Sequence, residues 1–350
     1  MFRVLTCDAE GWLDSVCRAE GDVALMSPAW LTAGAIAIGG AKPELFVYER
    51  KGSIFCYPFL RREIPWLRGA FDIESAYGYS GPTSNDRSGD FVRSAWGVFD
   101  GWARSQMIVA EFIRFHPLLE NHLLVADTRA VDIDRNTVVV EVGKGEPIFS
   151  AKYRGALRRD VAAAERFNLE FTVGPADHGM EEFIRQYQNT MARVDAPQFY
   201  CFSEAYFLQL KRIPDVHVAS VRSRGRLVSS ALVVTSGAYV HYHLAGSDGD
   251  EAKRVHSSQF LLHNLFKWAA ARGCAAVGLG GGRTKSDSDT LYRFKASFSP
   301  KRIPFRVGKR IHDRGRYDYL LQVWARRAGK PPLGDVLLSY RLPTGSKALL

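Results

Sequence analysis

Lys295, in the last quarter of the chain, is a residue whose charge could serve chemistry. It lies between Phe294 and Phe298 in the run F-K-A-S-F, where two aromatic rings could hold its stem. An ammonium group fixed in this way can stabilise negative charge that develops on an oxygen atom of a substrate. Two alternatives are open: Lys295 could pair with Asp289 as a structural ion pair, or Asp289 could simply cap the helix that carries the lysine. The sequence therefore predicts a candidate site centred on Lys295.

The elements before Lys295 form a recognisable order. Apolar residues at Leu261, Leu265 and Trp268, with Leu262, Phe266 and Ala269 on the adjoining rows, predict a helix, and Gly273 suits its left-handed end. Residues 275–279 read as a buried strand, and the triplet Gly280 to Gly282 lets the backbone leave the sheet. The glycines lack the spacing of a nucleotide-binding fingerprint, and neither a phosphate-binding loop nor a G-x-S-x-G elbow is present.

Several short motifs resemble the Fem-type aminoacyltransferases, relatives of the acetyltransferase fold that use aminoacyl-tRNA as acyl donor. They are W-A-x-x-x-G at 268–273, the glycine triplet with Asp289, F-K-x-x-F at 294–298, YGYSGP at 77–82, RFHPL at 114–118, Lys152-x-Arg154 with Arg158 and Arg159, YQNTMAR at 187–193 and YHLAG at 242–246. Together they cover about residues 71–300 in the order expected of that family. The long helical hairpin of its larger members has no counterpart here.

The resemblance implies an α/β (α+β) fold of two tandem acetyltransferase-like (GNAT-like) domains, with mixed sheets flanked by helices, facing each other across a cleft. We place the first domain at residues 1–148 and the second at 149–315, and expect the tail 316–350 to pack back on the first. A faint internal repeat agrees, because a hairpin followed by a helix and a strand occurs twice. The two hairpins turn at Lys51-Gly52 and at Arg224-Gly225.

The resemblance also suggests roles for residues beyond Lys295, the predicted catalytic residue. The predicted substrate-binding residues are Tyr77, Tyr79, Arg114, His116, Arg154, Arg158, Tyr242, His243 and Gly246. The predicted tRNA-binding residues are Phe294, Phe298, Lys301, Arg302, Arg306, Lys309 and Arg310. Structural alternatives stay open for several of them: the tyrosine loop could pack its own rings, and His116 could be a structural histidine. Arg154 and Arg158 could instead form surface ion pairs with Asp160 or Glu165.

Charge is concentrated near the C-terminus. Between Lys301 and Lys330 there are ten Lys or Arg and two Asp, which makes +8 of the formal +10 of the chain. Basic residues interleaved with aromatic ones are typical of a surface that binds a polyanion. The alternative is a solvated helix whose arginines cover neighbouring carboxylates. Arg154 and Arg158, four residues apart, would share one helix face and could clamp a phosphate.

Composition sets further bounds. The 350 residues, 46% hydrophobic and 24% charged, suffice for two globular domains. Five scattered cysteines with no C-x-x-C pair favour a reducing compartment, and we expect no metal site. No targeting segment is visible, and no apolar run reaches the roughly 20 residues of a membrane span. We therefore expect a cytoplasmic protein without a transmembrane segment.

These observations leave three functional hypotheses. We favour an aminoacyltransferase that moves an amino acid from charged tRNA to the amine of a small-molecule or peptide acceptor, such as a natural-product or cell-envelope precursor. It would need no cofactor beyond its co-substrate and no DNA partner. The alternatives are an acyl-CoA-dependent N-acyltransferase of the same fold, whose usual pyrophosphate loop is missing from the sequence, and a catalytically silent RNA-binding protein. The sequence does not identify the amino acid, the acceptor, a general base or the oligomeric state.

Overall fold

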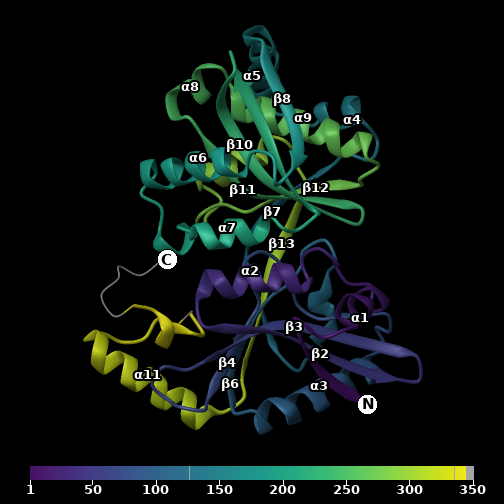
Figure 1. The fold of residues 1–350 in the computed structure, drawn as a ribbon, viewed down its shortest axis with the longest axis vertical. Coiled ribbons are helices and arrows are strands. Elements are labelled where there is room, and N and C mark those ends of the chain that lie inside the picture. Colours follow the sequence, from purple (N-terminus) through teal and green to yellow (C-terminus); the bar gives the residue numbers. More distant parts are fainter. Residues whose placement is uncertain (126, 335, 344–350) are drawn as a thin grey trace. The chain divides into compact units, whose positions relative to one another are not determined.

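The computed structural model describes residues 1–125, 127–334 and 336–343 (Figure 1). Its contacts divide the chain into two compact units. The first unit comprises residues 1–134 and 305–350, and the second unit comprises residues 135–304. Within the predicted tail, positions 335 and 344–350 lie outside the described residues. The cleft predicted between the units stays a prediction.

The sheet of the first unit has six main strands. They are ordered β1 (Phe2–Thr6), β2 (Ala41–Arg50), β3 (Ser53–Glu63), β4 (Phe71–Glu74), β6 (Ile108–Arg114) and β13 (Arg302–Ile311). Neighbours are antiparallel except β4 and β6, which are parallel. A short strand, β5 (Thr83–Ser84), pairs with β3.

The sheet of the second unit repeats this pattern. Its strands are ordered β8 (Leu169–Pro175), β9 (Val216–Ser223), β10 (Arg226–Ser236), β11 (Tyr239–Ser247), β12 (Ala276–Gly280) and β7 (Ala130–Glu141). Again only the fourth and fifth strands, β11 and β12, are parallel. The predicted hairpins are confirmed, with positive φ at Lys51 and Gly52 in one and at Arg224 and Gly225 in the other.

The division of the chain differs from the predicted boundaries because β7 and β13 each contribute to the unit to which the sequence analysis did not assign them. β7 precedes the body of the second unit and pairs with β12 through residues 138–141. β13 follows that body and pairs with β6 through residues 307–311. Residues 135–148 therefore lie in the second unit, and residues 305–315 lie in the first.

Helices cover both faces of the first sheet. α3 (Gly89–Ser105) covers one face, while α1 (Trp12–Arg18) and α2 (Pro28–Ile38) cover the other (Figure 1). Strand β3 serves both because its side chains alternate. Phe55, Tyr57 and Phe59 pack with Trp96 and Phe99 of α3, and the Sγ of Cys56 donates to a carbonyl of α1.

The C-terminal segment completes the first unit. In α11 (Arg314–Ala328), Leu320 and Trp324 join a core with Val109 of β6. Beyond α11, the hydroxyl of Tyr340 and the Nε of Arg341 donate to the buried carboxylate of Asp72, at 3.0 and 2.6 Å. This segment is therefore fixed by apolar and by charged contacts.

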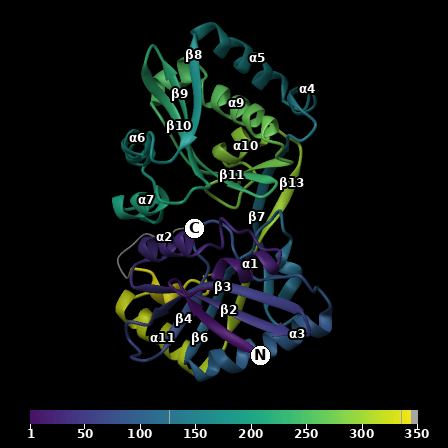
Figure 2. The ribbon, with the colours of Figure 1, turned by 45° about the vertical axis from the view of Figure 1, so that its right-hand side comes forward.

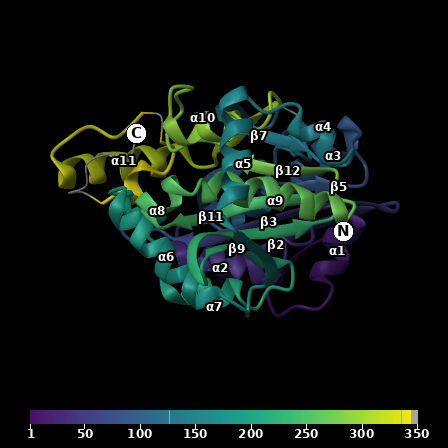
Figure 3. The same ribbon diagram turned by 90° about the horizontal axis from the view of Figure 1, so that it is seen from above.

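The second sheet also lies between helices. On one face lie α4 (Glu146–Ser150), α5 (Gly155–Ala164), α9 (Ser257–Ala271) and α10 (Thr290–Ala296), and on the other lie α6 (Met180–Arg193) and α7 (Glu204–Leu210), as Figures 2 and 3 show. The helix predicted through Leu261, Leu265 and Trp268 is confirmed as α9, and so is its left-handed end at Gly273. Within the part of the chain that is described, no helix is long and apolar enough to cross a membrane.

Candidate functional site

The candidate site begins where the parallel strands of the second unit part. β11 and β12 pair at three positions only, ending at His241 and Gly278. Beyond that point β11 continues along β10 to Ser247, whereas β12 ends at Gly280, whose φ of 71° turns the backbone away from the sheet. Backbone groups that leave a ladder in this way are open to a ligand or to side chains.

Cations from two elements hold the glycine turn that follows β12. The Nζ of Lys295 donates to the carbonyl oxygen of Gly281 at 2.8 Å, and Nη1 of Arg135 donates to that of Gly282 at 2.9 Å. At positions 281 and 282 there is no room for a side chain, so both must be glycine. A Cβ on Gly281 would meet the Cδ of Arg135 at 2.8 Å, and a Cβ on Gly282 would meet Oδ1 of Asp289 at 2.5 Å.

Asp289 organises the other side of the turn. Its carboxylate accepts the backbone N–H of Tyr292, which caps α10, and the backbone N–H groups of Arg283 and Thr284. Burial raises the pKa of Asp289, but these hydrogen bonds outweigh it and leave the pKa below its usual value. The capping role is thus observed. No ion pair joins Asp289 to Lys295 among the described residues.

Lys295 is a buried cation with hydrogen-bonding capacity to spare. Only 8% of the residue is exposed. Burial lowers the pKa of its ammonium to about 8; Arg135 lowers it too, and Asp289 opposes both. An ammonium has three N–H donors, of which Gly281 takes one, so in the described structure two are left for a substrate.

The aromatic surroundings of Lys295 differ from the prediction. The ring beside its Nζ is that of Tyr242, with its centroid at 5.9 Å. Phe298 is fully buried and packs on Phe266 and Tyr153 in the core, so in this structure it cannot stack on a nucleotide. Phe298 lies just beyond the end of α10 at Ala296, and its ring also contacts that of Phe294, with centroids 5.4 Å apart.

Two other predicted residues of β11 have structural partners. A β-bulge at His243 leaves this residue outside the regular pairing with β10, and its Nε2 lies 2.9 Å from the hydroxyl of Tyr206 in α7. Burial, together with His241, lowers the pKa of His243 to about 3. Gly246 is buried where a Cβ would lie 2.9 Å from the backbone nitrogen of Tyr187 in α6. Gly246 therefore permits close packing of a helix on the sheet.

In the first unit, the predicted substrate residues gather at the corresponding place, the ends of the parallel strands β4 and β6. The ring of Tyr79 lies 5.7 Å from that of His116, and Tyr77 belongs to the same loop. His116 accepts the N–H of Leu119 at Nδ1, so its Nε2 carries the proton toward Asp22 at 3.1 Å. The guanidinium of Arg114 lies over the ring of Phe112. Their roles in substrate binding stay predictions.

A buried charge cluster fills the space behind these strands. Arg129 binds Asp100 and both oxygens of Glu111, which also lies 2.8 Å from Nε2 of His312. Although burial raises it, Arg129 and His312 lower the pKa of Glu111 to about 2. Asp100, Glu111 and His312 are close enough to share a cation, but Arg129 already occupies the two carboxylates. Arg310 also pairs with Asp100.

Several of the predicted tRNA-binding cations already have partners within their own units. Lys301 and Arg302 belong to the second unit, and Arg306, Lys309 and Arg310 belong to the first. Lys301 pairs with Glu141 and Lys309 with Asp132, both at 2.8 Å. Arg302 donates to carbonyls at the end of α10. Neutralisation by neighbours thus removes much of the positive charge that the sequence concentrates here.

Three arginines near Lys295 escaped the sequence analysis. Arg135 is 160 positions away and reaches the site only because β7 joins the second sheet. Arg283 in the turn and Arg293 on α10 are exposed and have no ion pair among the described residues. The sequence did offer a signal for Arg283 and Arg293, because both lie close to the F-K-x-x-F motif in the chain.

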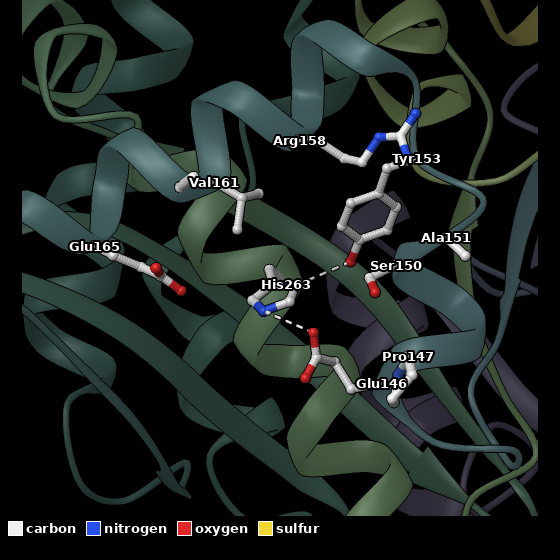
Figure 4. A pocket seen from close by; sticks show the side chains of 10 residues that line it. Glu146, Pro147, Ser150, Ala151, Tyr153, Arg158, Val161, Glu165 and His263 are labelled. Atoms are coloured by element: carbon white, nitrogen blue, oxygen red, sulfur yellow. Dashed lines mark hydrogen bonds and ion pairs between the residues drawn. The ribbon is translucent and has the colours of Figure 1, made fainter.

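The predicted phosphate clamp lies on α5. Arg154 precedes the helix and Arg158 lies one turn further on, both exposed, and the predicted alternative partner Asp160 lies 3.6 Å from His256 instead. Arg158 lines a pocket of about 340 Å³ between α4, α5 and α9, into which Tyr153, His263 and Glu146 also point (Figure 4). None of these last three residues was predicted.

Comparison with known proteins agrees with this fold. Residues 151–296 match the acetyltransferase (GNAT) domain family. No curated protein sequence matches the chain. The crystal structure of FemX is similar with a TM-score of 0.70 at 12% identity, over 91% of this chain and 99% of that chain.

Two further solved structures have lower scores. L-PGS from Bacillus licheniformis has a TM-score of 0.55 at 14% identity, over 87% of this chain and 92% of that chain. The C-terminal domain of an Agrobacterium fabrum protein named as a putative lysylphosphatidylglycerol synthetase has a TM-score of 0.53 at 18% identity, over 85% and 91%. The predicted Fem-like fold of two tandem acetyltransferase-like units is confirmed.

Proposed function

We propose that the protein is an aminoacyl-tRNA-dependent aminoacyltransferase that forms an amide bond on the amine of a small-molecule or peptide acceptor. The observation that carries the proposal is the buried Lys295 ammonium, which lies at the parting of β11 and β12 with two unused N–H donors. The fold supports it, because the Fem-type proteins that the sequence resembles share this architecture.

The reaction needs positioning more than activation. The acceptor amine attacks the ester carbonyl of the charged tRNA, so a C–N bond forms and the bond to the ribose oxygen breaks. The amine loses a proton and the ribose oxygen gains one, so neither ATP nor a redox partner is required. The tetrahedral intermediate carries negative charge on the former carbonyl oxygen, and a preorganised donor lowers the barrier to its formation.

Lys295 is the proposed donor to that oxygen. Its pKa of about 8 keeps most of the side chain charged at neutral pH. Arg135 and Asp289 would act as positioning residues, because they fix the turn whose Gly281 carbonyl holds the ammonium. No residue of the site is proposed as the general base, and the leaving ribose oxygen can accept the proton of the amine.

The segment between β11 and α9 favours tRNA over CoA as donor. An acyl-CoA enzyme of this fold would need a glycine-rich loop there to cradle a pyrophosphate. Instead the segment forms the helix α8 (Gly249–Arg254), whose first turn carries Asp250 and Glu251 after Asp248. Each of these carboxylates pairs with a cation, namely Arg226, Lys253 and Arg254, so the missing glycine-rich loop, and not charge repulsion, disfavours CoA. The acyl-CoA-dependent N-acyltransferase is therefore the second candidate.

Incubation with a pool of charged tRNAs and a panel of amines tests the proposal. The panel should contain peptides, amino sugars and, given the similar synthetase structure, phosphatidylglycerol as a hydroxyl acceptor. We expect a new amide in the mass spectrum and deacylated tRNA in equal amount. Amide formed from acetyl-CoA without tRNA would replace the proposal by the second candidate.

A further inference from the structure

The pocket on the helical side of the second unit has the features of a built site. It holds about 340 Å³ and is lined by aliphatic groups of Pro147, Ala151, Val161 and Ala162 and by four ionisable side chains besides Tyr153 (Figure 4). It shares no lining residue with the Lys295 site. Its function is therefore a separate question.

A buried histidine directs one ring nitrogen into this pocket. His263 is only 6% exposed, and the hydroxyl of Tyr153 lies 3.2 Å from its Nδ1. Its Nε2 lies 3.9 Å from Oε1 of Glu146, too far for a hydrogen bond. His263 lines the pocket, so a ligand or water in the pocket can reach this nitrogen and hydrogen-bond to it. The space between His263 and Glu146 is thus prepared for a hydrogen-bonding atom.

The charges around this space favour a cationic group. Glu146 from α4 and Glu165 at the end of α5 contribute two carboxylates, against one guanidinium from Arg158. Burial lowers the pKa of His263, as does Lys267, while Glu146 and Glu165 oppose the shift. A neutral imidazole whose Nδ1–H donates to the Tyr153 hydroxyl presents Nε2 as an acceptor. The lining therefore carries net negative charge around a neutral acceptor.

We propose that this pocket binds a primary alkylammonium group, with its N–H donors directed to the Glu146 carboxylate and His263 Nε2 and its alkyl stem against Pro147 and Val161. Tyr153 fixes the ring of His263 from the far side, so the acceptor atom is held in place before binding. An anion would meet two carboxylates, and a divalent cation finds no third ligand atom close enough in the described residues.

Titration of the full chain with n-butylammonium chloride at constant ionic strength tests this site, followed through the ¹⁵N signal of His263 Nε2. Because the probe is small, we expect saturable binding with a dissociation constant on the order of 10 mM. Glu146→Gln should weaken binding about tenfold or more, because a charge-assisted hydrogen bond is removed. His263→Gln, which can keep a bond to Tyr153, should weaken it as well; in this variant binding is followed through the backbone amide ¹⁵N signals of residues that line the pocket, because the imidazole is gone.

Glu170→Gln is the matched control, since it removes one carboxylate from an exposed position on β8 of the same unit. It should leave butylammonium binding unchanged, and tetramethylammonium, which has no N–H, should not compete. The assignment is overturned if Glu146→Gln and Glu170→Gln bind the probe equally, if tetramethylammonium competes as well as butylammonium, or if butyrate binds more tightly. The measurement does not depend on turnover, so it stands apart from the proposed reaction.

Discussion

At the scale of single residues, the stability of the chain should depend on the charge of Lys295. Its pKa is about 8 in the folded chain against an ordinary value of 10.5. Between these values the unfolded chain binds more protons, so the free energy of unfolding rises with pH across this window. Below pH 8 the cost of the buried charge is present in full, on the order of 3 kcal/mol.

The substitution Lys295→Met removes the free-energy cost of burying the ammonium charge. The variant should therefore melt no lower than the wild type at pH 7, although the Gly281 carbonyl loses its hydrogen-bond donor. The stability of the wild type relative to the variant should increase from pH 7 to pH 10.5, as seen by chemical denaturation at both pH values. Turnover should fall by about 100- to 1000-fold, as for the loss of an oxyanion donor. A variant that melts lower yet turns over normally would make Lys295 a structural residue.

Arg135 should set the pH at which Lys295 loses its charge. Its guanidinium lowers the pKa of the lysine, and both cations hold adjacent carbonyls of one turn. In Arg135→Gln the falling limb of the single-turnover pH profile, near pH 8 in the wild type, should move to higher pH. Arg135→Lys should restore the limb in part. An unmoved limb in Arg135→Gln, with Lys295→Met inactive, would remove Arg135 from the site while leaving the lysine in it.

At the scale of elements, the glycine turn should be intolerant of a single methyl group. A Cβ on Gly282 would displace the carboxylate of Asp289, and with it the cap of α10. We expect Gly282→Ala to cost about 1–3 kcal/mol of stability, measured by thermal unfolding, and to reduce turnover of the folded fraction. Gly174→Ala on β8 is the control, because its Cβ meets nothing within 4 Å. Equal effects of both substitutions would contradict this account.

The same elements show how far the sequence could lead. The hairpins, the helix before Lys295 and its glycine stop follow from local propensities, and the structure has them where the sequence predicts them. The packing of the lysine does not follow, because Tyr242 comes from a different strand and Phe298 turns into the core. The bulge at His243 could not be predicted either. A bulge is a change in the register between two strands, and the alternation of polar and apolar residues along a single strand does not reveal it.

At the scale of the whole molecule, the long-range pairing of β7 and β13 explains the boundaries. A composition break at 142–150 indicates a loop, and the chain does turn there, but it has already joined the second sheet through β7. The number of strands in a sheet depends on long-range pairing, which no local signal reports. Arg135 was missed as a site residue for the same reason.

The ion pairs along the chain also change the prediction for tRNA binding. Six phosphate contacts would give a slope of about −4 to −5 in log K against log salt. Lys309 is already neutralised by Asp132, so Lys309→Ala should leave the slope nearly unchanged. Arg283 and Arg293, by contrast, are exposed and flank Lys295 in the sequence. Replacing both by alanine should reduce the slope by about 2, because each arginine would otherwise neutralise one phosphate. Filter binding of charged tRNA at several salt concentrations measures each slope. If Lys309→Ala lowers the slope and the double variant does not, the nucleic acid lies along β13 of the first unit and the site around Lys295 loses its proposed donor.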